Sequence, residues 1–297
     1  TVVLVVGKGN KNFITIGMIN IVVSANAGGA FSPFGDITTL MVWQRGFVSF
    51  FDFFNIFIPS VVNYIIPATI MSFFISNKVP EGDGKKVQIL PGGKVIAILG
   101  ILTIAITVTG HQALHMPPVF GMMFGLGLLG TYGYFLKVKS TEKNKFDIFH
   151  LTGKAEWDTL LFFYGILVAV GGLAALGYLK LISDDMYVTL GPTYANILVG
   201  FLSAIIDNIP IVYAVLTAHP SMDMGQWLLI TLTAGVGGSL LSIGSAAGVA
   251  LMGQARGIYT FFAHLKWSWA ILLGYAASVA THLWLNSHLF DLVPLSK

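Results

Sequence analysis

The sequence predicts an all-α fold: a polytopic transmembrane helical bundle with inverted repeats, two re-entrant hairpins and broken helices. Of the 297 residues, 55% are hydrophobic and only 10% are charged, and the mean hydropathy is +0.80. This composition is too apolar for a soluble domain. Because a helix needs about 20 mostly apolar residues to cross the hydrocarbon core, we expect membrane spans at 55–76, 93–110 with a short extension, 115–137, 157–179, 192–217 and 267–290.

Two longer apolar segments, 12–46 and 225–257, carry glycine clusters in the same order. In each, a double glycine is followed six residues later by a third glycine, then by a polar residue and finally by Arg-Gly. The motif residues are Gly28, Gly29, Gly35, Asp36, Arg45 and Gly46 in the first segment and Gly237, Gly238, Gly244, Ser245, Arg256 and Gly257 in the second. Paired apolar segments interrupted by Gly or Pro are the best sequence indication of a transporter binding site. We therefore expect each segment to form a re-entrant hairpin.

The distribution of lysines predicts how the chain is oriented. Two loops on either side of the span pair 93–137 hold nine lysines: Lys78, Lys85, Lys86, Lys94, Lys137, Lys139, Lys143, Lys145 and Lys154. Both loops lie on the same side of the membrane, and the positive-inside rule makes that side cytoplasmic. The hairpins 12–46 and 225–257 then enter from opposite faces, so the two copies are inverted.

The inverted repeat divides the chain into three predicted parts. Residues 1–76 form the C-terminal part of repeat 1, residues 77–154 form connecting spans and cytoplasmic loops, and residues 155–297 form repeat 2. The second hairpin is preceded by a span and by the broken helix 192–217, whereas only residues 1–6 have counterparts before the first. We expect the natural protein to begin at least roughly 55 residues earlier.

The helix 192–217 is predicted to break at Asp207-Asn208-Ile209-Pro210. Pro210 lacks a backbone donor and clashes with the preceding turn. Backbone carbonyls freed at membrane depth are tolerated where they line a cavity or find other partners. Carbonyl, carboxylate and amide oxygens together suit a hard cation, and Ser203, about one turn away, adds a hydroxyl.

Two carboxylates, Asp36 and Asp207, lie deep within apolar sequence. An intramembrane acid is costly and is by default a functional residue. The alternative is a structural acid paired with a buried base, but the two segments contain no base except Arg45 and Arg256 at the hairpin ends. Since the site offers two acids and no base, we predict that it binds a cation.

Polar side chains beside the hairpin glycines complete the predicted site. We expect sodium at Asp36, Asp207 and Asn208. Further ion- or proton-binding oxygens are expected from Asn26, Thr38, Thr39, Ser203, Ser239 and Ser242. A buried carboxylate that binds either a proton or sodium, open alternately to each side, gives exchange by competition. No resident cofactor is predicted, and with no cysteine a thiolate metal site is excluded.

The chain resembles the NhaD-type sodium/proton antiporters, part of the ion-transporter superfamily with re-entrant hairpins. The resemblance rests on residues 24–39 (SANAGGAFSPFGDITT), 207–210 (DNIP) and 237–245 (GGSLLSIGS), and it extends over nearly the whole chain. It implies exchange of sodium or lithium for protons across the bacterial inner membrane, favoured at alkaline pH. It also implies that Asn26, Asp36, Thr38, Thr39, Ser203, Asn208, Ser239 and Ser242 are critical for transport, with Asp207 in the same motif. The first Asp-Asn break of the family has no counterpart here.

Other functions remain as alternatives. An anion exchanger of the same architecture, for dicarboxylate, arsenite or sulfate, would place a base or Ser-Asn-Thr clusters at both hairpin tips. An intramembrane aspartyl protease would use Asp36 and Asp207 as a catalytic pair, but it has no need of symmetric hairpins, so we expect no enzyme. The predicted partners are membrane lipid, sodium or lithium ions and protons, and not nucleic acid. A homodimer through the span pair 93–137, which carries the GxxxG step Gly121–Gly125, stays open.

Overall fold

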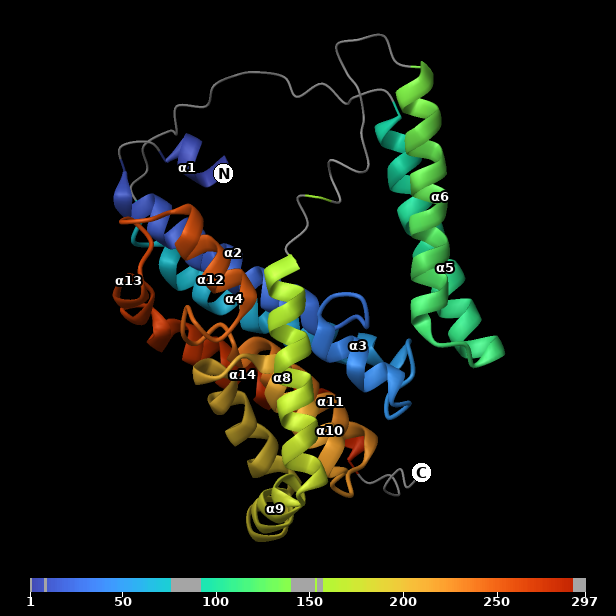
Figure 1. Ribbon diagram of the computed structural model, residues 1–297. Helices are drawn as coiled ribbons and strands as arrows, with labels where there is room; N and C mark the ends of the chain where they lie inside the picture. Colours follow the sequence, from blue (N-terminus) through green and yellow to red (C-terminus); the bar gives the residue numbers. More distant parts are fainter. Residues whose placement is uncertain (1, 8–9, 76–91, 140–152, 154–156, 291–297) are drawn as a thin grey trace. The chain divides into compact units, whose positions relative to one another are not determined.

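The computed structural model describes residues 2–7, 10–75, 92–139, 153 and 157–290, and every regular element in those residues is a helix (Figure 1). The α-helices are α1 (Val2–Val6), α2 (Lys11–Ala30), α3 (Ile37–Gln44), α4 (Phe57–Ser72), α5 (Gly93–Leu114), α6 (Pro118–Lys139), α8 (Trp157–Ala175), α9 (Tyr178–Ile205), α10 (Asn208–Ala218), α11 (Met224–Gly237), α12 (Ala246–Gln254), α13 (Phe261–Leu265) and α14 (Ser268–Leu285). Two 3-10 helices, η1 (Asp52–Ile56) and η2 (Ser287–Leu289), precede α4 and follow α14.

The all-α membrane fold is confirmed. Within the described residues, six helices are long and apolar enough to cross a membrane: α2, η1 with α4, α5, α6, α9 and α14. The chain divides into two compact units, one formed by residues 1–83 and 165–297 and the other by residues 84–164. The lysine loops that set the predicted orientation lie mostly outside the described residues.

Both predicted hairpins consist of two helices joined by a turn at the glycines. Residues 31–36 separate α2 from α3, and residues 238–245 separate α11 from α12. A side chain on Gly35 would collide with the Gly29 carbonyl, and one on Gly238 would lie 2.7 Å from the Gly244 carbonyl. In each turn, the second residue of the double glycine and the third glycine are therefore needed, because the two sides of the turn touch at these residues. Entry from opposite membrane faces remains a prediction.

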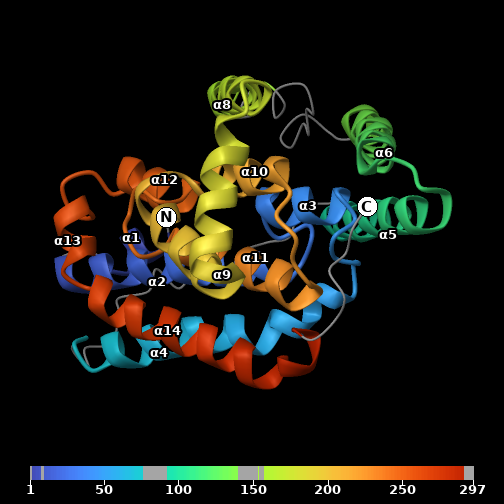
Figure 2. The ribbon, with the colours of Figure 1, turned by 90° about the horizontal axis from the view of Figure 1, so that it is seen from below.

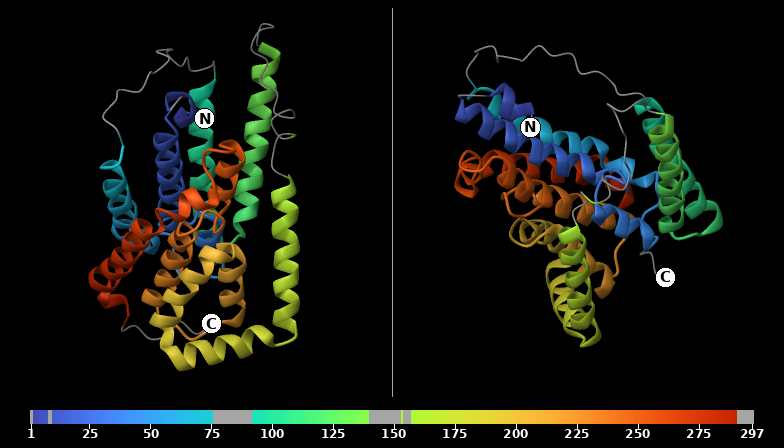
Figure 3. Two further views of the ribbon diagram at one scale, coloured as in Figure 1. Left: turned by 90° about the vertical axis from the view of Figure 1, so that its left-hand side faces the viewer. Right: turned by 45° about the horizontal axis from the view of Figure 1, so that its top comes forward.

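The helix α9 is longer than predicted. We expected a span from residue 192, but the helix begins at Tyr178 and changes direction at Gly191, whose φ is 74°. Figure 3 shows the segment before this bend turning away from the segment after it. The next residue, Pro192, cannot donate a backbone hydrogen bond, so the bend costs little at this point. The break predicted at residues 207–210 is present, because α9 ends at Ile205 and α10 starts at Asn208.

The helix α11 forms the centre of the larger unit. Every residue from Gly225 to Gly237 is buried, and α11 packs against α2, α3, α9, α10 and α14. Its contact with α9 depends on two glycines, since a Cβ on Gly237 would strike the Gly200 carbonyl. The helices that follow the hairpins, α4 and α14, lie side by side (Figure 2), and Gly274 faces the Asn63 carbonyl and Pro67. The matching helices of the two repeats are thus in direct contact.

The smaller unit is built on the helix pair α5 and α6. The GxxxG step of α6 packs inside this pair, because a Cβ on Gly121 would lie 2.6 Å from the Thr107 Cα and one on Gly125 would collide with the Thr103 side chain. Close approach of backbones at small residues is the usual way in which membrane helices associate. The step therefore serves the hairpin itself, and a homodimer through this hairpin stays a prediction with no support from these glycines.

The α5–α6 contact gives a direct test of this packing. We expect Gly121→Ala to destabilise the protein by about 1–3 kcal/mol, because the added methyl forces the two backbones apart. The matched control is Gly127→Ala, since Gly127 lies on the same helix and a Cβ there meets nothing within 4 Å. Thermal melting of the purified protein in detergent should show a lower midpoint for Gly121→Ala alone. Equal midpoints would contradict the packing.

Candidate functional site

Asp36 ends the turn of the first hairpin as the N-cap of α3. Its Oδ1 accepts a hydrogen bond from the Ile37 backbone N–H at 2.6 Å, and its Oδ2 accepts one from the Thr38 hydroxyl at 3.0 Å. A carboxylate at this place also interacts favourably with the positive end of the helix dipole. The start of α3 therefore fixes Asp36 in position.

Asn208 connects the broken helix to the first hairpin. Its Nδ2 donates to the Asp36 Oδ2 at 2.8 Å, across 172 residues of sequence. Asp207, the N-cap of α10, accepts a longer bond of 3.4 Å from the Ile209 backbone N–H. Asp207 is also close enough to Asp36 for the two carboxylates to repel each other. The structure thus brings together the three residues at which we predicted sodium.

A second connection joins helix α2 of the first hairpin to the turn of the second. The Asn26 Nδ2, on α2, donates to the Ser239 hydroxyl at 2.9 Å and to the Ser245 hydroxyl at 3.0 Å. Ser245 is the N-cap of α12, as Asp36 is the N-cap of α3. In both hairpins the capping side chain therefore accepts a hydrogen bond from an asparagine of the other repeat.

Thr39 and Ser203 bind backbone carbonyls at the same region. The Thr39 hydroxyl lies 2.8 Å from the Ser32 carbonyl and 2.7 Å from the Asp36 carbonyl, which closes the first turn. The Ser203 hydroxyl donates to the Ala234 carbonyl at 2.7 Å, which holds α9 against α11. Since a hydroxyl oxygen keeps lone pairs after donating, these bonds leave both oxygens able to accept or to bind a cation.

Ser242 is completely buried, and its hydroxyl has no hydrogen-bond partner among the described residues. A buried polar group without a partner is costly, especially in a membrane. Ser242 lies in the turn of the second hairpin, where an oxygen ligand was predicted. A cation or a water molecule at the turn would satisfy this hydroxyl.

The charges at the site favour a cation. Neither Asp36 nor Asp207 forms an ion pair with a lysine or arginine of the described part of the chain. The two arginines of the motif lie beyond the ends of the hairpin helices, with Arg45 following α3 and Arg256 following α12. Within the described residues, no group of three or more His, Asp or Glu side chains is placed to hold a metal ion. The arrangement is therefore that of two carboxylates with amide and hydroxyl oxygens.

Sequence analysis missed the residues that bond to the backbone of the second hairpin turn. His264 in α13 and Ser268 at the start of α14 bond to the carbonyls of Ser239 and Leu240. Tyr259 in turn contacts His264. No motif marks these residues, because they follow the hairpin in the sequence and act on its backbone.

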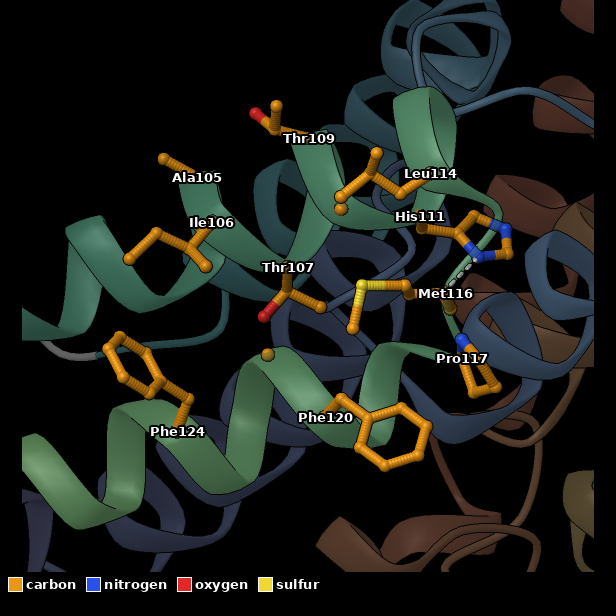
Figure 4. A pocket seen from close by; sticks show the side chains of 12 residues that line it. Ala105, Ile106, Thr107, Thr109, His111, Leu114, Met116, Pro117, Phe120 and Phe124 are labelled. Carbon is orange, nitrogen blue, oxygen red and sulfur yellow. Dashed lines mark hydrogen bonds between the residues drawn. The ribbon is translucent and has the colours of Figure 1, made fainter.

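A cavity of about 600 Å³ lies in the smaller unit, between α5 and α6. Its lining is largely apolar and includes Leu114, Met116, Phe120 and Phe124, with His111 at one side (Figure 4). It contains no carboxylate and none of the predicted site residues. The cavity is therefore not the candidate ion site.

Comparison with known proteins identifies the family of the chain. Residues 1–235 match the family model described as Citrate transporter. The chain is 55% identical to the Na(+)/H(+) antiporter NhaD of Alkalimonas amylolytica over 98% of its length, and it spans 65% of that protein. It is 54% identical to NhaD of Vibrio parahaemolyticus over 93% of the chain, and spans 72% of that protein. Sodium/proton antiporter 1 of Arabidopsis thaliana is 34% identical over 92% of the chain, which spans 49% of that relative.

The match to the Vibrio protein covers most of both chains, and the motifs at the site are those on which the predicted resemblance rests. The family model described as Citrate transporter covers a smaller part of the chain than this match does. The chain belongs to the family of NhaD-type sodium/proton antiporters.

Proposed function

We propose that the full-length protein containing this chain exchanges Na⁺ or Li⁺ for H⁺ across the bacterial inner membrane by alternating access. The observation that carries this proposal is the hydrogen bond from Asn208 to Asp36, beside the second acid Asp207. It joins the broken helix of one repeat to the hairpin turn of the other. Relatives named as sodium/proton antiporters support the same assignment.

The proposed exchange follows from competition at the carboxylates. A proton on Asp36 or Asp207 removes the negative charge that attracts sodium, and bound sodium disfavours protonation. Because the two acids lie close enough to repel each other, a cation or proton bound at one reduces the repulsion felt by the other. Asp36, Asp207 and Asn208 would bind the cation directly. Asn26, Thr38, Thr39, Ser203, Ser239 and Ser242 would supply further oxygens or hold the turns, and no resident cofactor is required.

Alternating access follows from the arrangement of the repeats. The contact between the two hairpins consists of hydrogen bonds from Asn26 to two serines, Ser239 and Ser245. Such a contact can break and form again while the chain stays intact. In inverted-repeat transporters, one repeat or bundle moves against the other around a central site. Rearrangement of this contact would expose the acids to one side and then to the other.

The description of the matching family model raises the alternative of an organic anion. The description Citrate transporter names a substrate with several carboxylates. Such a substrate would need a basic side chain or a free helix N-terminus facing it. Here the N-terminal end of α3 is already occupied by Asp36, and no described lysine or arginine pairs with either acid. Cation exchange is therefore favoured over anion exchange.

The two acids give the first test of the proposed function. We expect Asp36→Asn and Asp207→Asn each to lower sodium-dependent exchange to less than about a tenth of the original rate, because the exchangeable charge is lost. Everted membrane vesicles with an imposed pH gradient report the exchange as a collapse of the gradient on addition of Na⁺, Li⁺, K⁺ or citrate. The matched control is Asp184→Asn, since Asp184 is an exposed acid near the start of α9. Collapse with citrate alone would favour the anion exchanger instead.

Asn208 gives a second test, which separates cation affinity from exchange as such. Removing a hydrogen bond to a charged group costs about 1.5–3 kcal/mol. We therefore expect Asn208→Ala to raise the half-saturating Na⁺ concentration by about tenfold or more. The control is Asn20→Ala, because the Asn20 amide bonds only within its own helix and to the Met71 sulfur. Unchanged half-saturation in Asn208→Ala would show that the contact with Asp36 does not contribute to the ion site.

A further inference from the structure

The second hairpin turn is held by a buried chain of polar contacts that sequence analysis did not assign to the site. The Tyr259 hydroxyl lies 2.7 Å from the His264 Nδ1, and the His264 Nε2 lies 2.8 Å from the Ser239 carbonyl. The Ser239 hydroxyl then accepts the hydrogen bond from Asn26. The chain of contacts therefore runs from α13 to the meeting point of the two hairpins.

The contacts determine which proton His264 carries. A carbonyl oxygen only accepts hydrogen bonds, so Nε2 must bear the hydrogen that points to Ser239. In the neutral ring Nδ1 is then an acceptor, and the Tyr259 hydroxyl donates to it. His264 is fully buried, and burial lowers its pKa to about 4. A neutral ring with a fixed tautomer gives a rigid link with one donor and one acceptor.

His264 acts at the point where the helix α11 unwinds. Ser239 is the second residue after α11 ends at Gly237, and its carbonyl has no place in a helical ladder. The neighbouring Leu240 carbonyl accepts a bond of 2.6 Å from the Ser268 hydroxyl. The carbonyls of Ser239 and Leu240 are thus bonded to α13 and α14. The Ser239 hydroxyl remains as the group that bonds to Asn26.

The first repeat has no equivalent of this arrangement. Tyr259 and His264 follow Arg256 by three and eight residues, and the residues at the same distances from Arg45 are Val48 and Phe53. Both Val48 and Phe53 are buried, as are their counterparts. Since the architecture accepts apolar residues at these positions in one copy, folding alone does not require a tyrosine and a histidine in the other.

We propose that His264 is a positioning residue for the cation site, which fixes the Ser239 turn and so sets the affinity for Na⁺. This inference rests on the proposed sodium/proton exchange. Tyr259 supports it by holding the ring of His264. Loss of the contact would leave the Ser239 carbonyl without a partner and free the turn to move away from Asn26, which weakens cation binding more than it slows turnover.

Four variants of the full-length protein test this role in everted vesicles. We expect His264→Leu to raise the half-saturating Na⁺ concentration by about tenfold, with the maximal rate within about threefold of the original. His264→Gln, whose amide reaches the Nε2 position, should stay within about threefold of the original half-saturation. His264→Asn, whose amide reaches only the Nδ1 position, should resemble His264→Leu. Tyr259→Phe should shift half-saturation in the same direction by a smaller factor.

His282 provides the matched control, because it makes the same kind of contact at the other end of α11. Its Nε2 lies 3.0 Å from the Gly225 carbonyl, its Nδ1 accepts from Asn286, and it is also fully buried. His282→Leu should lower the melting temperature of the purified protein but leave the half-saturating Na⁺ concentration unchanged. Equal shifts of half-saturation in His264→Leu and His282→Leu would overturn the inference, since they would reflect stability alone.

The outcomes separate this inference from the function on which it rests. Sodium-dependent exchange in the original protein with unchanged half-saturation in His264→Leu overturns the inference and leaves the proposed function standing. Absence of any response to Na⁺ or Li⁺ in the original protein overturns both. If His264→Leu does not accumulate, His264→Asn and His264→Gln are compared with each other. A higher half-saturating Na⁺ concentration for His264→Asn than for His264→Gln supports the role, and equal values overturn it.

Discussion

The structure depends on one constraint, which is that polar groups freed by a broken helix inside a membrane must find partners in the protein. An unpaired backbone or side-chain group in hydrocarbon costs several kcal/mol. This protein breaks its helices at two hairpin turns and at residue 207, and it satisfies the breaks by placing them together. Asn208 bonds to Asp36, and Asn26 bonds to Ser239 and Ser245. The candidate site is thus a product of the same contacts that make the breaks tolerable.

Small residues make this arrangement possible. The turns close because Gly35 touches Gly29 and Gly244 touches Gly238, and α9 reaches α11 because Gly200 faces Gly237. Without a hydrophobic force between helices in lipid, close backbone approach supplies much of the association energy. The hydroxyls of Ser203 and Thr39 then bond to carbonyls at short distances. Packing and polar pairing are therefore coupled, and a larger side chain at a turn would disrupt both.

The sequence predicted the parts of the fold that residue type alone determines. Glycine spacing located both turns, and Asp207-Asn208-Ile209-Pro210 located the break, because Gly and Pro act through their own backbones. The start of α9 was missed, since Gly191-Pro192 is also typical of a loop between two helices. Partners could not be predicted either. That Asn208 donates to Asp36, or His264 to the Ser239 carbonyl, depends on the folded arrangement of residues distant in sequence.

The two repeats are similar in backbone but differ in their acidic residues, and in the proposed exchange this difference would determine where the cation binds. Asp36 and Ser245 each follow the first glycine of their motif by eight residues, each caps the next helix, and each accepts a bond from an asparagine of the other repeat. Of these two caps only Asp36 is an acid, and Asp207 lies near it. A symmetric pair of caps therefore yields one acidic half and one neutral half. In the proposed exchange, the acidic half would attract the cation and the proton, whereas the neutral half, held by His264, would supply hydroxyl oxygens and fixed geometry.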